Sequence, residues 1–99
     1  MEKNQIYKKE TIIDFKKPGM YKVVLLNDDY TTMDFVVDML IAVFHKCPTD
    51  AAKIMLDTHE KGRGVIGVYT FDIARTKIAQ VKQMALKNDF PLMIIMEPE

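Results

Sequence analysis

Four polar side chains in this chain are of the types needed to hold a charged or N–H-bearing group. Asn27, Asp28 and Asp29 follow one another directly after an apolar run, and His59 lies later, beside a glycine turn. A carboxylate and an amide oxygen accept hydrogen bonds, and a neutral imidazole offers one nitrogen lone pair. Each residue also has a simpler interpretation, because Asn and Asp are common in turns and a helix end favours histidine through its dipole. The residue types alone leave both interpretations open.

The first three of these side chains stand at a corner between two elements that we expect in the core. Met20–Leu26 is a short, β-prone apolar run and predicts a strand. After the corner, Thr31 is expected to be the N-cap of a helix over about 32–45, with Asp34 as its capping-box acid. Such a corner can bind a group that is apolar at one end and charged at the other. The apolar face of this helix consists of Phe35, Val36, Met39, Leu40, Val43 and Phe44.

A second helix is expected to carry the histidine. Pro48 should end the preceding helix, Thr49 should cap the new one, and Gly62 should supply the left-handed conformation at its end. Residues at positions i, i+3 and i+4 share one face of a helix. On this helix the residues at that spacing are Met55, Thr58 and His59.

The remaining pattern completes a small α+β domain. A strand is expected over about 65–69, then a helix over Phe71–Lys87 capped by Thr70, and a last strand over Leu92–Met96. The order β-α-α-β-α-β predicts three helices packed on one face of a three-stranded antiparallel sheet. The inner stripe expected of the third helix is Ile73, Ala74, Ile78, Val81 and Ala85.

The composition is that of one cytoplasmic domain. The 99 residues carry no net charge, which argues against nucleic-acid binding, and no apolar run approaches the length of a membrane helix. The N-terminus has no apolar segment typical of a secretion signal, and Cys47 is the single cysteine. We expect residues 1–17 to be a mobile tail and residues 18–99 to be the folded domain.

The segment YKVVLLNDDYTTMDFV, residues 21–36, closely resembles the signature of the ClpS family. The later segments HEKG (59–62), GVYT (67–70), TK (76–77) and PL (91–92) resemble the remaining motifs of the family in the right order. The match spans about residues 19–97. The resemblance implies a fold like that of the ribosomal-stalk C-terminal domain and no enzymatic activity, cofactor or metal.

The resemblance further implies an adaptor that delivers substrates to a Clp AAA+ unfoldase, ClpA-like or ClpC-like. ClpS proteins bind N-degrons, which are substrates whose first residue is Leu, Phe, Tyr or Trp. Asn27, Asp28 and His59 would then surround the α-amino group of that first residue. Its side chain would enter a pocket lined by Thr31, Met33, Val36, Met55, Thr58 and Leu92.

Three positions refine this expectation. Met33 stands where the family uses methionine to exclude β-branched Ile and Val by shape. Thr58 stands where family members often carry an aliphatic residue, which predicts a slightly more polar or differently sized pocket. Thr32 replaces a common proline, which should loosen the helix start only slightly.

Asp72 and Lys77 match the family's acidic and basic positions for docking the N-domain of the unfoldase. The residues themselves also fit a first-turn acid and a solvated lysine of the third helix. We expect a monomer, and the resemblance implies that the tail helps to deliver the cargo.

Two other classes of function compete with an adaptor. In an enzyme, Asp28 could orient His59 as a base, but no nucleophile motif accompanies this pair. In a stalk-type docking domain, the fold would present a protein-binding face without any need for Asn27, Asp28 and His59.

Overall fold

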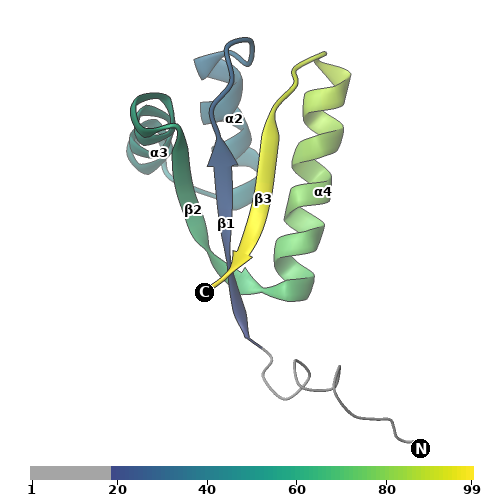
Figure 1. Ribbon diagram of the computed structural model, residues 1–99. Coiled ribbons are helices and arrows are strands. Elements are labelled where there is room, and N and C mark those ends of the chain that lie inside the picture. The colour runs from purple at the N-terminus through teal and green to yellow at the C-terminus, as the bar shows by residue number, and fades with distance from the viewer. Residues whose placement is uncertain (1–18) are drawn as a thin grey trace, which may run out of the picture.

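The computed structural model describes residues 19–99, which form three helices on one face of a three-stranded antiparallel sheet (Figure 1). This arrangement confirms the predicted α+β class and the β-α-α-β-α-β order. The predicted tail, residues 1–17, lies outside the described residues. The elements are β1 (Met20–Leu26), α2 (Met33–Phe44), α3 (Pro48–Lys61), β2 (Arg63–Thr70), α4 (Phe71–Lys87) and β3 (Met93–Pro98).

The central strand of the sheet is β1, because the strand order is β2-β1-β3 and both pairings are antiparallel. The β1–β2 pairing contains a bulge. Val23 pairs with Gly67 and Val24 pairs with Val65, so Ile66 is an extra residue in β2. Ile66 is nevertheless 3% exposed and packs in the core, so the bulge keeps this side chain on the helix-covered face.

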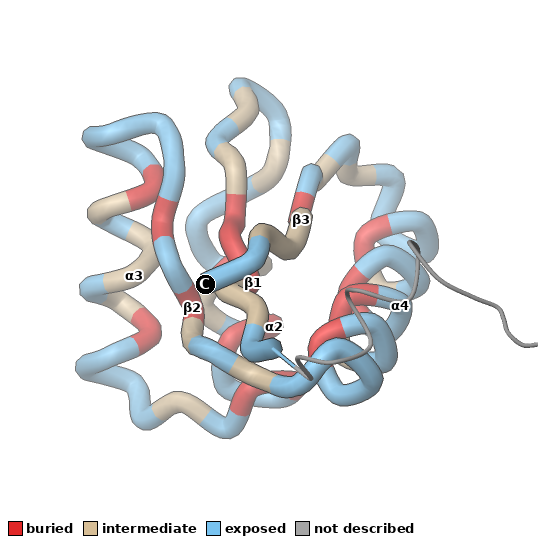
Figure 2. The backbone as a smooth tube through the Cα atoms, turned by 60° about the horizontal axis from the view of Figure 1, so that its bottom comes forward, coloured by how far each residue is buried: buried red, intermediate tan, exposed pale blue. Residues whose placement is uncertain are grey.

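The three helices bury their apolar faces against one side of the sheet. In Figure 2 the buried positions of α3 and α4 face inward, toward the strands. Alternation along β1 places Val23 and Leu25 in this core, as expected for a strand covered on one face. Ile73 is 48% exposed, so its predicted place on the inner stripe of α4 is wrong. The core consists of Val23, Leu25, Val36, Met39, Leu40, Val43, Phe44, Ala51, Ile66, Ala74, Ile78, Val81 and Ile94.

On the opposite face of the sheet, a salt bridge covers the middle strand. Arg63 of β2 donates to Glu97 of β3 at 2.8 Å. Arg63 pairs with Leu26 and Glu97 pairs with Lys22, so the bridge must cross β1 near Val24. Val24 is completely buried outside the main core, between its cross-strand neighbours Val65 and Ile95 and beneath this crossing. The hydrogen bond from the guanidinium also lowers the pKa of the Glu97 carboxyl.

Two of the predicted helix starts are wrong by one or two residues. The N-cap of α2 is Thr32, whose hydroxyl accepts from the backbone N–H of Phe35 at 3.1 Å. Thr31 does not cap, because its N–H and its hydroxyl both donate to Asp28. The N-cap of α3 is Cys47 and not Thr49, because Pro48 already occupies the first helical position.

Helices α2 and α3 both end at a residue with left-handed backbone. His45, with φ of 56°, ends α2 before Pro48 is reached, so the proline is not what stops this helix. Gly62, with φ of 87°, ends α3 as predicted. Thr70 is the N-cap of α4 by position, but its side chain makes no capping hydrogen bond.

Candidate functional site

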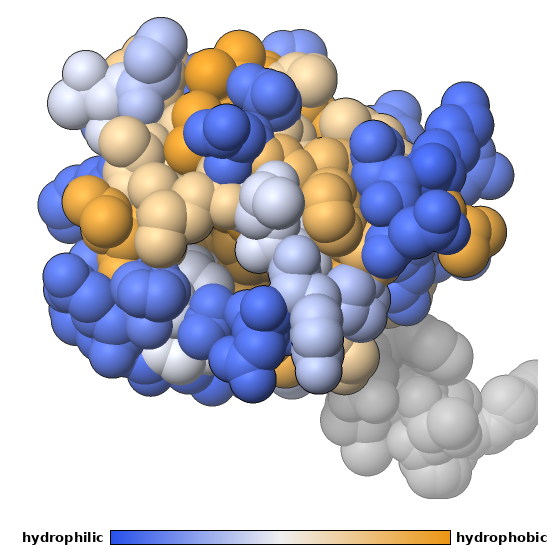
Figure 3. Space-filling view, turned by 90° about the horizontal axis from the view of Figure 1, so that it is seen from above, coloured by the Kyte–Doolittle hydropathy of each residue, from blue (hydrophilic) through white to orange (hydrophobic). Residues whose placement is uncertain are grey.

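A cavity of about 400 Å³ opens at the end of β1. In Figure 1 this end of β1 points toward the top of the view. The walls of the cavity come from the end of β1, the loop that follows, the first turn of α2, the second half of α3 and the residue before β3. Figure 3 looks down on this end of the molecule and shows apolar atoms exposed among hydrophilic groups. All nine residues that the sequence analysis placed in a pocket line this one cavity: Asn27, Asp28, Thr31, Met33, Val36, Met55, Thr58, His59 and Leu92.

The loop after β1 is organised around the carboxylate of Asp28. Oδ1 accepts from the backbone N–H groups of Tyr30 at 2.8 Å and Thr31 at 2.7 Å. Oδ2 accepts from the hydroxyl of Thr31 at 2.7 Å. Burial raises the pKa of Asp28, but the hydrogen bonds from Thr31 and Tyr30 outweigh it and lower the pKa below 3.8. Because a carboxylate has about four lone-pair positions, one on Oδ2 remains for a ligand.

A backbone hydrogen bond ties this loop to the histidine turn. The N–H of Asn27 donates to the carbonyl of Gly62 at 3.0 Å, which joins the end of β1 to the end of α3. Gly62 in turn donates to the carbonyl of Thr58 at 2.9 Å, so the last turn of α3 is closed. His59 lies on this last turn, and its side chain and that of Asn27 are both exposed. The contact holds the two polar groups at the same rim.

The inner wall of the cavity is apolar. Val36 is 8% exposed and Thr58 is 5% exposed, whereas Met55 and Leu92 are half-buried. Met33 is 47% exposed and lies at the start of α2. The cavity therefore joins hydrogen-bond acceptors at an exposed rim to an apolar interior, which suits a ligand with a cationic head and a hydrophobic side chain.

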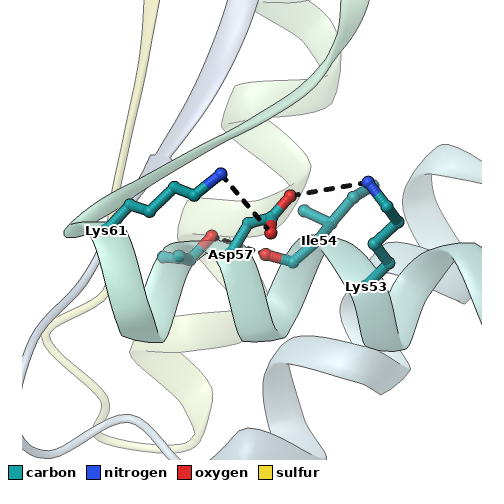
Figure 4. Close-up of polar contacts among 5 residues, drawn as sticks. Lys53, Ile54, Asp57 and Lys61 are labelled. Atoms are coloured by element: carbon teal, nitrogen blue, oxygen red, sulfur yellow. Dashed lines mark hydrogen bonds and ion pairs between the residues drawn. The ribbon is translucent and has the colours of Figure 1, made fainter.

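The hydroxyl of Thr58 does not add a free donor to this interior. It donates to the carbonyl of Ile54, one turn earlier in α3, at 2.8 Å. Figure 4 shows this helix from the side, with Asp57 between Lys53 and Lys61 at 3.9 and 4.0 Å on its surface. The Thr58 hydroxyl was expected to make the pocket more polar, but its hydrogen bond within α3 largely removes this effect.

Five further residues line the cavity that the sequence analysis did not assign to it. Each lies in the stretch 25–32, so the polar corner that pointed to Asp28 could also have pointed to these neighbours. Tyr30 is 76% exposed and stands at the rim. The five are Leu25, Leu26, Asp29, Tyr30 and Thr32.

The family model for ATP-dependent Clp protease adaptor protein ClpS matches residues 16–95. The chain belongs to the ClpS family. A ClpS adapter protein of Acetivibrio thermocellus is 67% identical over 99 residues, covering 100% of both chains. One of Syntrophus aciditrophicus is 59% identical over 81 residues, covering 82% of this chain and 76% of its own. ClpS proteins are adaptors of the Clp protease and not themselves proteases.

A solved ClpS structure confirms the fold. Agrobacterium tumefaciens ClpS2 bound to L-phenylalaninamide matches with a TM-score of 0.81 and 41% identity, covering 84% of this chain and 100% of that chain. Within residues 19–99, we find no helix long and apolar enough to cross a membrane. The same residues contain no group of three or more His, Cys, Asp or Glu side chains placed to hold a metal ion.

The resemblance to ClpS assigned Asp72 and Lys77 to unfoldase docking. Both residues lie in the first half of α4, away from the cavity. Asp72 is exposed in the first turn, and Lys77 is half-buried. The ammonium of Lys77 donates to the carbonyl of Val43 at 2.8 Å and lies over the rings of Phe44 and Tyr69, at 5.6 and 6.0 Å from their centroids. Lys77 therefore also anchors α4 to the end of α2. Asp72, Ile73, Thr76, Lys77 and Gln80 line a depression of about 280 Å³.

Proposed function

We propose that this ClpS-family chain recognises proteins by a free α-amino group and a first residue of Leu, Phe, Tyr or Trp. It then delivers them to a Clp AAA+ unfoldase for degradation. The observation that carries this proposal is the single cavity in which Asn27, Asp28 and His59 meet an apolar interior. An N-terminal residue has the matching shape, because its charged amine and its side chain leave the same carbon atom.

The α-amino group is the part of the ligand that the rim recognises. An α-amine has a pKa of about 8, so it is mostly protonated at neutral pH. The low pKa of Asp28 keeps its carboxylate charged there, and Oδ2 retains a lone pair for a charge-assisted hydrogen bond. The amide oxygen of Asn27 and a ring nitrogen of His59 supply two further acceptors for the ammonium.

The side chain of the first residue occupies the apolar interior. Val36, Met55, Thr58 and Leu92 form this part of the cavity, and burying a Leu or Phe side chain contributes roughly 1.5–3 kcal/mol. The L-phenylalaninamide bound to ClpS2 has a free amine and a phenyl side chain, and that protein is 41% identical to this one. This ligand supports the same mode of binding here. Met33 at the rim excludes β-branched first residues by shape.

Delivery requires a second contact, with the unfoldase. Asp72 and Lys77 are the side chains proposed to dock the N-domain of a ClpA-like or ClpC-like partner, with the adaptor acting as a monomer. Both line the depression on α4, and Ile73 within it is 48% exposed, so the surface combines charge with apolar area. Such a combination is typical of protein interfaces.

Fluorescence anisotropy with a labelled peptide that starts with Phe tests the recognition step. The same peptide with an acetylated N-terminus is the control, because acetylation removes the charge and leaves the rim acceptors poorly matched. We expect binding to require both the free amine and Asp28, and to be lost in Asp28→Ala. Equal binding of both peptides, or binding that Asp28→Ala leaves unchanged, would favour a docking domain without amino-terminus recognition.

A further inference from the structure

Helix α3 packs closely against strand β2 at Gly64. Gly64 is buried and pairs with Leu25 of β1, which itself lines the cavity. A Cβ atom at this position would overlap the hydroxyl oxygen of Thr58 and would lie 3.1 Å from the carbonyl oxygen of Ile54. The backbone of Gly64 is not left-handed, unlike that of Gly62. The glycine is therefore required for space and not for conformational freedom.

Neither neighbour can move away from an added Cβ without changing the pocket. Thr58 is 5% exposed, and its hydroxyl is held by the carbonyl of Ile54 at 2.8 Å. Rotating this side chain would break that hydrogen bond inside a buried contact and turn a different face of Thr58 toward the cavity. Shifting α3 outward instead would carry Met55 and His59 with it, because all three residues lie within about one turn of the helix.

We propose that Gly64 is a positioning residue for the pocket. By letting α3 rest directly on β2, Gly64 sets the distance between the α3 side of the cavity and the β1 side, and it leaves room for the present rotamer of Thr58. Gly64 itself touches no ligand and acts through Thr58. This inference rests on the proposed function, since it concerns how that same site is shaped.

A double-mutant cycle tests the inference. Gly64→Ala adds the offending Cβ, and Thr58→Ala removes the atom that this Cβ meets first. Overpacking of this kind should weaken binding of the Phe-starting peptide by about tenfold or more in Gly64→Ala. On the Thr58→Ala background, the same change at Gly64 should weaken binding by no more than about threefold, because the overlap with the hydroxyl is gone and only the milder approach to the Ile54 carbonyl, at 3.1 Å, remains.

A matched control is Gly67→Ala on the same strand. Its Cβ would also be crowded, at 2.9 Å from the hydroxyl oxygen of Tyr69, but the neighbour is the far end of one flexible side chain and does not line the cavity. We expect this variant to bind like the wild type. We also expect the ratio of affinities for Phe-starting and Leu-starting peptides to change in Gly64→Ala and to stay the same in Gly67→Ala. A general loss of stability would not change this ratio.

The outcomes separate this inference from the proposed function. A wild type that does not distinguish free from acetylated peptide refutes the proposed function. If the wild type distinguishes the two peptides and Gly64→Ala binds the free-amine peptide as tightly as the wild type, only the role of Gly64 is refuted. If Gly64→Ala does not fold, the double variant should still fold and bind within about threefold of Thr58→Ala. A double variant as damaged as the single one would overturn the inference.

Discussion

Asp28 holds its own loop together and is proposed to bind the ligand amine, and two substitutions separate these two roles. Its carboxylate accepts three hydrogen bonds within its own loop, two on Oδ1 and one on Oδ2. Asp28→Asn keeps an oxygen for the two backbone donors, and the Thr31 hydroxyl can turn to accept from the new amide. Asp28→Ala removes every one of these acceptors. The first change therefore removes chiefly the negative charge, whereas the second also dismantles the loop.

The magnitudes follow from these contacts. A hydrogen bond to a charged group contributes roughly 1.5–3 kcal/mol, so Asp28→Asn should weaken binding of a free-amine peptide by about 10- to 150-fold. Its free energy of unfolding should fall by no more than about 1 kcal/mol, because the loop keeps its neutral hydrogen bonds. Asp28→Ala should cost about 1–3 kcal/mol in stability, because the N–H groups of Tyr30 and Thr31 lose their acceptor.

Anisotropy titrations and urea denaturation measure these two quantities on the same proteins. The acetylated peptide is the internal control, since its weak binding should be nearly the same in the wild type and in Asp28→Asn. The reasoning fails if Asp28→Asn binds the free-amine peptide as tightly as the wild type. It also fails if the alanine variant is no less stable than the asparagine variant, because the loop hydrogen bonds would then contribute nothing.

Four further predictions concern the ionisation of Asp28, the ligand amine, the cap of α2 and Lys77. The folded-state pKa of Asp28 is lowered, so its contribution to stability should be complete above pH 3.8 and should be lost as the pH falls through that lowered pKa, as urea denaturation at a series of acidic pH values measures. Peptide binding should weaken above about pH 8, where the ligand amine loses its proton, as anisotropy titrations at higher pH measure. Thr32→Ala should lower the free energy of unfolding by about 1 kcal/mol, as seen by urea denaturation, because it removes the capping acceptor for Phe35. Lys77→Met should lower the free energy of unfolding by about 1 kcal/mol in the same assay, because it removes the donor to the Val43 carbonyl. Peptide affinity should be unchanged, because Lys77 lies far from the cavity. A variant as stable as the wild type would contradict this prediction.

Most of the fold follows from local patterns in the chain. The run Met20–Leu26 and the apolar stripes of the helices carry the periodicities of strand and helix, and Gly62 ends α3 as a left-handed residue. Local sequence does not determine the start of α2, because Thr31 and Thr32 are chemically identical candidates for the N-cap. The choice depends on Asp28, which takes both donors of Thr31 and leaves Thr32 to cap.

The long-range contacts of the site could not be read from the sequence. Lys77 meets the carbonyl of Val43 across 34 positions of the chain, so a solvated surface lysine was an equally good interpretation of the sequence. The role proposed for Gly64 depends on how closely α3 approaches β2, which no local pattern encodes. The hydroxyl of Thr58 predicted a more polar pocket, but its hydrogen bond to Ile54 is specific to the folded helix.

The topology separates the pocket from the proposed docking face. Asn27 follows the last residue of β1, whereas the first residue of that strand, Met20, pairs with Thr70, which directly precedes α4. Six strand steps of about 3.3 Å therefore place the cavity and the start of α4 roughly 20 Å apart, at opposite ends of the sheet (Figure 1). The proposed contacts for the first residue of a substrate, at Asp28, and for the unfoldase, at Asp72, therefore do not overlap. In the proposed function, delivery then needs no release of the substrate before the unfoldase docks.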